Sequence, residues 1–118
     1  MENIDIFLTL KEVVKKSISN IEKWDKALLY IKKMKGNTGF ESSYIYDGNE
    51  VKIDTTANYL THKAVTKLYD ITQNEFPKHK DWNRAIFTLF PNNKFEMEYI
   101  WDEELQQEVD GYNNSSTT

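Results

Sequence analysis

Residues 40–53 read FESSYIYDGNEVKI and predict two strands joined by a tight turn. The aromatic residues Phe40, Tyr44 and Tyr46 fall on one side at the period of two that is typical of a strand, and Tyr and Phe suit a pleated surface. Asp47 and Gly48 are a strong hairpin signal, because both central residues of a two-residue turn need positive φ. Val51 and Ile53 then alternate with polar residues in the next strand. One side of the first strand is predicted to carry Phe40, Ser42, Tyr44 and Tyr46.

Upstream of this hairpin, residues 27–34 predict another strand and residues 36–39 a turn, so residues 24–54 form a three-stranded meander. The alternative that Ala27–Leu29 continues a preceding helix stays open. Residues 5–22 predict a helix capped by Asn3 or Asp5, because apolar residues recur at spacings of three and four. They are Ile6, Leu10, Val13, Val14, Ile18 and Ile21.

Downstream, a second helix is predicted from caps at Thr55, Thr56 or Asn58 to Phe76–Pro77, because the residue before proline is pushed away from helical angles. Its inner stripe is Leu60, Ala64, Leu68 and Ile71. Residues 78–81 are expected to form a polar loop. Residues 82–90 predict a strand that is apolar on both sides and therefore central. Residues 91–93 predict a turn, because proline is favoured at the second turn position and asparagine is common in turns.

Residues 95–101 predict the clearest strand of the chain. Phe95, Met97, Tyr99 and Trp101 point one way, and Glu96, Glu98 and Ile100 point the other. Asp102, Glu103 and Glu104 open a polar segment that could add a short helix. Residues 1–110 are expected to form one domain, followed by a disordered tail at 111–118. The predicted fold is α+β, a two-layer sandwich in which both helices pack on one face of an antiparallel sheet.

Composition excludes several classes of protein. The 118 residues include no cysteine, which removes disulfide scaffolds, thiol catalysis and zinc sites built on cysteine. The longest apolar run, Ala27–Ile31, is far shorter than the roughly 20 residues of a membrane span. The acidic start is unlike a signal peptide, and a cytoplasmic location is expected. Residues 1–35 carry 8 Lys against 5 acids, whereas residues 77–118 carry 4 Lys or Arg against 8 acids. This gradient argues against nucleic-acid binding and favours basic partners.

Few residues point to catalysis or to a cofactor. Four glycines, at 36, 39, 48 and 111, cannot build a glycine-rich phosphate loop. His62 and His79 lie far apart and are interpreted as solvated histidines rather than metal ligands. No serine lies in a strand-to-helix elbow, and no carboxylate pair is marked as an acid–base pair. We therefore expect no cofactor and no catalysis, with an unrecognised acid–base enzyme as a remote alternative.

Two groups of side chains have both a structural and a functional interpretation. Glu96, Glu98, Asp102, Glu103 and Glu104 are by default solvated residues, or alternatively an acidic surface that blocks a basic partner. Aromatic residues in strands, such as Tyr44, Tyr46 and Trp101, are more often core residues than interface residues. The alternative is that part of this aromatic face stays exposed at the edge of the core.

In the order and spacing of its motifs, the chain resembles the YezG-like family of bacterial immunity proteins over about residues 5–102. The resemblance starts at Trp24-Asp25-Lys26, which is followed by a hairpin with glycines in its turn. It includes Ser43–Tyr46 and the helix that ends in Phe76. It finishes with Trp82 and Lys94–Trp101. Many members continue past the last strand with structured sequence, whereas this chain continues into Asn, Ser and Thr.

The resemblance implies an immunity protein without catalytic activity, which would neutralise the C-terminal toxin domain of a secreted effector of the LXG type. The expected partner is a basic nuclease domain, bound through the five acidic residues and three aromatic residues named above. An alternative is a small protein-binding regulatory module unrelated to toxins. The exposed strand edge beside Asp47–Gly48 also leaves a homodimer open.

Overall fold

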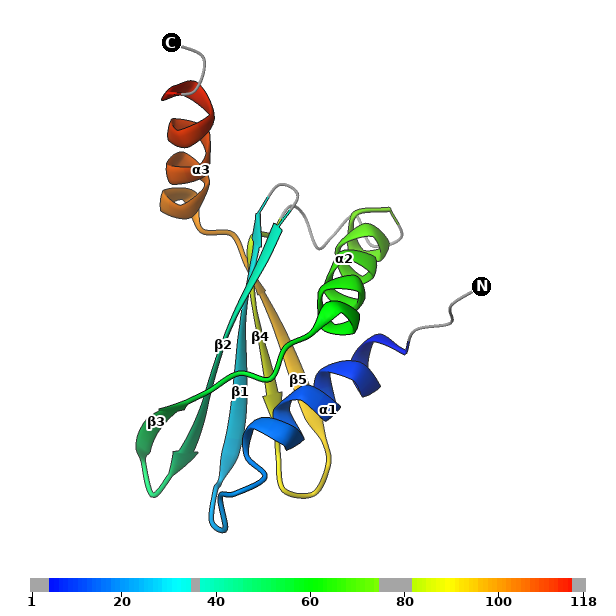
Figure 1. The fold of residues 1–118 in the computed structure, drawn as a ribbon, viewed down its shortest axis with the longest axis vertical. Helices are drawn as coiled ribbons and strands as arrows, with labels where there is room; N and C mark the ends of the chain where they lie inside the picture. The colour runs from blue at the N-terminus through cyan, green and yellow to red at the C-terminus, as the bar shows by residue number, and fades with distance from the viewer. Residues whose placement is uncertain (1–4, 35–36, 75–81, 116–118) are drawn as a thin grey trace.

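The computed structural model describes residues 5–34, 37–74 and 82–115 as three helices and five strands (Figure 1). The helices are α1 (Ile6–Ser17), α2 (Tyr59–Asn74) and α3 (Glu103–Ser115). The strands are β1 (Lys26–Met34), β2 (Asn37–Tyr46), β3 (Asn49–Ile53), β4 (Arg84–Leu89) and β5 (Phe95–Ile100). The predicted α+β class is confirmed, and so is the predicted order of the first seven elements.

The strands form one antiparallel sheet in the order β3-β2-β1-β4-β5, so β3 and β5 are its two edges. Strand β4 has neighbours on both sides, as its apolar sequence predicted. The β2–β3 hairpin turns at Asp47 and Gly48, whose φ angles of 50° and 78° confirm the predicted tight turn. Pro91 occupies the second position of the β4–β5 turn, which the Asn93 N–H closes by donating to the Phe90 carbonyl over 2.9 Å.

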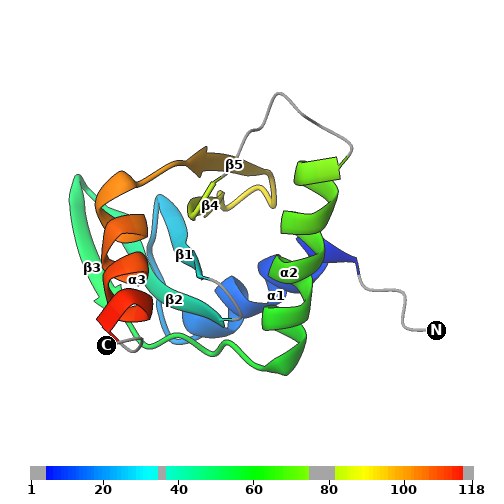
Figure 2. The ribbon, with the colours of Figure 1, turned by 90° about the horizontal axis from the view of Figure 1, so that it is seen from above.

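Helices α1 and α2 pack against the same face of the sheet, as predicted (Figures 1 and 2). We call this the helix face and the opposite side the open face. The register brings Leu29 of β1 opposite Ser42 of β2 and Phe87 of β4, so alternate residues of all five strands line the helix face. The largest fully buried apolar side chains of the core are Leu10, Val14, Leu29, Ile31, Val65, Trp82, Phe87 and Leu89.

Both core helices, α1 and α2, depart from their predicted limits or faces. Helix α1 ends at Ser17 rather than at residue 22, although Ile18 stays buried. Asn58 caps α2, since its Oδ1 accepts the Thr61 N–H over 3.2 Å. Leu60, predicted to lie on the inner stripe, is 48% exposed, and Thr61 and Val65 are buried instead.

Two segments predicted to be irregular are regular. Residues 37–39, assigned to a turn, belong to β2 and pair with residues 32–34 of β1. Helix α3 follows β5 and continues through Gly111 to Ser115, into the segment expected to be a disordered tail. The predicted polar loop at 78–81, the helix end at Phe76–Pro77 and His79 lie outside the described residues.

Candidate partner-binding surface

Strand β5 places Glu96 and Glu98 on the open face, away from both core helices. Each is opposite a residue of β4 whose side chain lies on the same face, Thr88 for Glu96 and Ile86 for Glu98. Both glutamates are exposed, and neither carboxylate has a hydrogen-bond or ion-pair partner among the described residues. Two residues of rise along a strand separate them by about 6.7 Å. The predicted alternation is confirmed, since Met97 and Tyr99 pack against the core.

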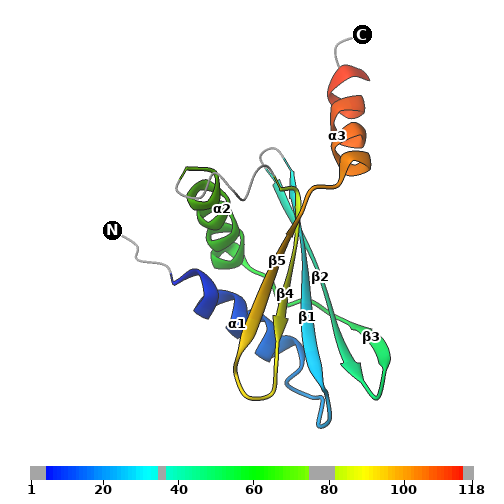
Figure 3. The same cartoon turned by 180° about the vertical axis from the view of Figure 1, so that it is seen from behind.

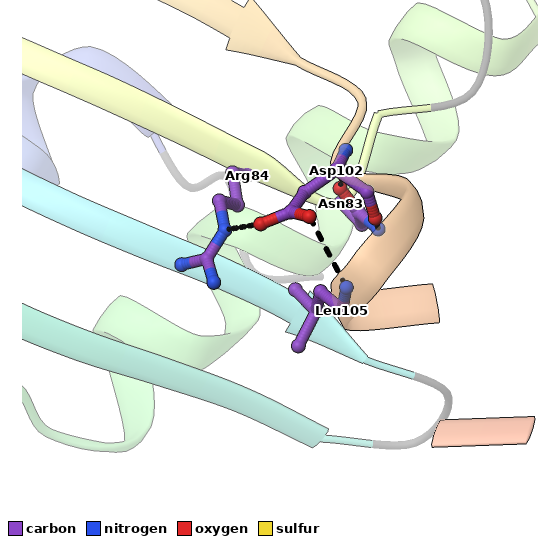
Figure 4. A network of polar contacts seen from close by, with 4 residues as sticks. All are labelled: Asn83, Arg84, Asp102 and Leu105. Atoms are coloured by element: carbon purple, nitrogen blue, oxygen red, sulfur yellow. Dashed lines mark hydrogen bonds and ion pairs between the residues drawn. The ribbon is translucent and has the colours of Figure 1, made fainter. Parts of the chain in front are cut away.

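Asp102 lies where β5 passes into α3, and its side chain is engaged within the chain (Figure 4). Its Oδ2 accepts from Arg84 Nε over 2.5 Å, and its Oδ1 accepts the Leu105 N–H over 3.1 Å. The Asn83 side chain bonds both backbone groups of Asp102, each over 2.7 Å. The Arg84 hydrogen bond, followed by that from Leu105, lowers the pKa of the Asp102 carboxyl below its usual 3.8. Asp102 therefore caps α3 and positions it on the sheet.

Trp101 and Glu103 form a local pair at the same junction. The indole N–H of Trp101 donates to Glu103 Oε2 over 2.7 Å, while 46% of the Trp101 side chain stays exposed. The hydrogen bond holds the indole beside a carboxylate at the surface. This is an amphipathic aromatic group of the kind that is enriched in protein interfaces.

Helix α3 carries further acids that were not among the predicted site residues. Glu104, Glu108 and Asp110 are exposed, and residues 103–115 contain no lysine or arginine. Gln106 donates to Asp110 over 3.0 Å. Glu104 and Glu108 are four residues apart and therefore lie on one side of the helix. Their grouping could be predicted from the sequence only if residues 103–115 were first predicted to be helical.

Tyr44 and Tyr46 lie on the helix face, on the other side of the sheet from Glu96 and Glu98. Tyr44 packs against the core, whereas Tyr46 is 43% exposed beside the β2–β3 turn. The eight predicted residues therefore do not form one site. Five of them, Glu96, Glu98, Trp101, Glu103 and Glu104, follow the β5–α3 segment, Asp102 holds the structure there, and the two tyrosines lie apart.

A groove of about 340 Å³ lies beside Arg84, the partner of Asp102. It is lined by Tyr30, Lys32, Met34, Gly39, Phe40, Glu41 and Arg84. The Tyr30 hydroxyl donates to both carboxylate oxygens of Glu50, over 3.1 and 3.0 Å, so its ring crosses β2 on the open face. Burial, followed by the hydrogen bond with Glu50, raises the pKa of Tyr30 above 10.0.

The described residues contain no group of His, Asp and Glu side chains that could hold a metal ion. His62, predicted to be solvated, is half-buried instead. Its Nδ1 is hydrogen-bonded to the Thr38 hydroxyl, and its ring and that of Phe40 form a T-shaped pair with centroids 5.1 Å apart. A second cavity, of about 310 Å³, lies between α1 and residues 56–61 and contains none of the predicted site residues.

None of the helices in the described part of the chain combines the length and the apolar character needed to cross a membrane. No model of a known protein family matches the chain, and no curated protein matches it.

Proposed function

We propose that this protein is an immunity protein that binds and neutralises the C-terminal toxin domain of a secreted bacterial effector in the cytoplasm of the producing cell. In this proposal it acts by binding alone, without catalysis. Its partner is a basic domain, most simply a nuclease whose substrate groove attracts phosphate. The observation that supports the proposal is an uncompensated acidic surface along β5 and α3. This acidic surface consists of Glu96, Glu98, Glu103, Glu104, Glu108 and Asp110.

The charge distribution favours a basic partner. All six carboxylates are exposed, and none of them forms an ion pair with another described residue. Acids concentrated in this way repel one another in the free protein, and a basic surface relieves that repulsion when it binds. A field of one sign also raises the association rate of an oppositely charged partner by about 10–1,000-fold at low salt.

The position of α3 supports a role in recognition. Seen from above, α3 lies on the other side of β1 from α1 and α2, and it extends beyond the end of the sheet (Figures 2 and 3). Leu105 is its only buried side chain among those described. Most helices gain their stability from packing an apolar face, and isolated helices shorter than about 12–15 residues are marginal. A partner that packs on α3 would add the burial that, among the described side chains of this helix, only Leu105 has.

Trp101 is the aromatic group best placed to anchor such a partner. It lies between Glu98 and Glu104 in the chain and stays half-exposed, while Glu103 fixes the orientation of its ring. Binding energy in interfaces concentrates on a few aromatic and arginine residues, and tryptophan is strongly enriched among them. Tyr46 ends β2, at the opposite end of the sheet from the β5–α3 junction, so the same partner surface would not reach both side chains.

The test is protection of cells that express a candidate toxin domain taken from a reading frame upstream of this gene. The wild-type protein is expected to restore growth and to bind the toxin domain. The double variant Glu98→Lys/Glu104→Lys is expected to lower the association rate about tenfold or more, with a weaker dependence on salt. Cells that die equally with and without the wild-type protein would show that it is not the immunity protein for this toxin.

A matched control separates local charge from net charge. Glu12→Lys/Glu22→Lys makes the same change in net charge at exposed positions outside β5 and α3 and is expected to leave binding unchanged. If both double variants bind like the wild type, the acidic surface is not the binding site. If binding is found to a host protein and to no toxin, the alternative of a regulatory binding module replaces the proposal.

A further inference from the structure

The edge strand β3 has backbone groups that no other strand uses. The Asp25 N–H donates to the Ile45 carbonyl over 2.7 Å, so the backbone groups of Ile45 point away from β3. Because these groups alternate in direction along a strand, Tyr44 and Tyr46 point toward β3 and bond their partners Val51 and Asn49. The N–H and C=O groups of Glu50 and Lys52 therefore point outward from the sheet.

This edge is open to solvent on both faces. Residues 49–52 are exposed, and 42% of the Val51 side chain is exposed although it points to the helix face. Figures 1 and 3 show β3 at the outer margin of the sheet, with no helix along its free side. Natural sheets usually protect such an edge, because a row of unpaired backbone groups is a template for another strand.

The charges along β3 are complementary to themselves. Glu50 and Lys52 lie on the open face, on either side of Val51. In an antiparallel pair of two β3 strands centred on Val51, Glu50 of each copy faces Lys52 of the other. These are also the residues with outward backbone groups, so each facing pair exchanges both N–H···O bonds, four in all. The two Val51 side chains meet at the non-hydrogen-bonded position, where side chains approach most closely.

We propose that two copies of this chain associate through β3 in this register, joining their sheets into one of ten strands. The two neighbouring registers that keep the hydrogen-bond pattern bring Glu50 opposite Glu50, or Lys52 opposite Lys52, and like charges directly opposite are destabilising. The charge pattern therefore selects both the partner, a second copy, and the register. The Tyr30 hydroxyl already orders the Glu50 carboxylate, which lowers the entropic cost of pairing it with Lys52.

The dimer is weak, because a five-residue strand buries less than the roughly 1,000 Å² of a stable specific interface. Sedimentation equilibrium and amide NMR shifts, measured from about 20 μM to about 1 mM, cover dissociation constants in the range expected for so small an interface. We expect reversible dimerisation in which the concentration-dependent shifts centre on residues 49–53. A protein that stays monomeric over this whole range overturns the proposal.

Charge swaps test the register directly. Lys52→Glu and Glu50→Lys each turn both facing pairs into like charges and are expected to weaken self-association about tenfold or more. An equimolar mixture of the two variants again opposes Glu and Lys in both pairs, so it is expected to form a heterodimer. The combined variant Glu50→Lys/Lys52→Glu again opposes Glu and Lys in both pairs and is expected to restore dimerisation, less the contribution of the lost Tyr30 contact.

Controls exclude effects of net charge and of the Tyr30 contact. Lys94→Glu and Glu22→Lys repeat the two charge changes at exposed positions outside β3 and are expected to leave dimerisation unchanged. Tyr30→Phe measures the cost of losing the hydrogen bond to Glu50. Circular dichroism of each variant confirms that it is folded. A dimer that both single swaps leave intact, or a mixture that does not associate, overturns the proposed register and the edge pairing with it.

Discussion

Replacing Leu105 by alanine should release α3 from the sheet without unfolding the rest of the protein. Leu105 is 6% exposed, yet it does not belong to the core cluster that joins α1, α2 and the helix face. The substitution removes about three buried carbons, worth about 2 kcal/mol at roughly 0.8 kcal/mol each. That free energy shifts the equilibrium between docked and released α3 by about 30-fold. Because a 13-residue helix is marginal alone, released α3 unfolds.

Hydrogen exchange measures this shift amide by amide. Protection factors at residues 107–111 should fall about 30-fold, while those in β1 and β4 stay unchanged. If most of the molecules release α3, the helical signal in far-UV circular dichroism falls by at most the fraction that α3 contributes, which is 13 of the 41 residues in the three helices. Gln107→Ala, at an exposed position of the same helix, is the control and should change neither signal. Unchanged α3 protection in the leucine variant, or a loss of protection equal in β1 and in α3, would refute the reasoning.

Thr72→Val should lower the free energy of unfolding by about 1–3 kcal/mol, because it leaves the buried indole N–H of Trp82 without its 2.8 Å acceptor; urea denaturation with Thr66→Val as an exposed control checks this. The folded pKa of Asp102 is lowered, so its stabilisation is full above the unfolded pKa of about 3.8 and is lost as pH falls through the folded value. Asp102→Asn should remove that part of the acid dependence, seen in unfolding curves between about pH 2 and 6. If the β3 dimer and the acidic surface are independent, Lys52→Glu should still bind one toxin domain per chain with unchanged affinity, as titration calorimetry would show.

The order of elements could be predicted because local chemistry agrees with the fold at most positions. Asp47–Gly48 supplies the positive φ angles that the hairpin needs, and the alternation around Met97 matches a strand with one covered face. The end of α1 could not be read from periodicity. Ile18 continues the apolar spacing and is buried, but its backbone has left helical geometry and it is the C-cap of α1. An apolar residue just past the end of a helix can therefore be buried and extend the apolar pattern beyond the helix.

Long-range contacts explain the errors at single residues. His62 looked solvated because nothing near it in the sequence pairs with it, whereas the fold brings it to Thr38, 24 positions away. Asp102 was assigned to a partner surface because it begins an acidic run. An aspartate before two glutamates is also a helix-capping signal, but its Arg84 partner could be found only from the β4–β5 register.

The candidate site was predicted in part, because the alternation of a strand assigns residues to two faces without saying what covers each face. The split of Glu98 from Met97 follows from the period of two alone. The separation of Tyr46 from Trp101 follows from the strand pairing, which places the end of β5 beside the start of β2 and Tyr46 at the opposite end of the sheet. The sequence predicted the meander of the first three strands but not the pairing of β1 with β4.

The two edge strands, β3 and β5, both have unpaired backbone N–H and C=O groups, but their side-chain charges have opposite effects on pairing with a second copy. On the open face of β5 the alternate side chains are Glu96 and Glu98, so an antiparallel pair of β5 strands centred on Met97 would set each glutamate against a glutamate. On β3 the equivalent positions hold Glu50 and Lys52, and the same operation sets opposite charges together. Self-pairing at β3 would leave β5 and α3 at the two far ends of a joined sheet. The glutamates that oppose the addition of a second copy to β5 therefore also leave this edge free for the basic partner proposed above.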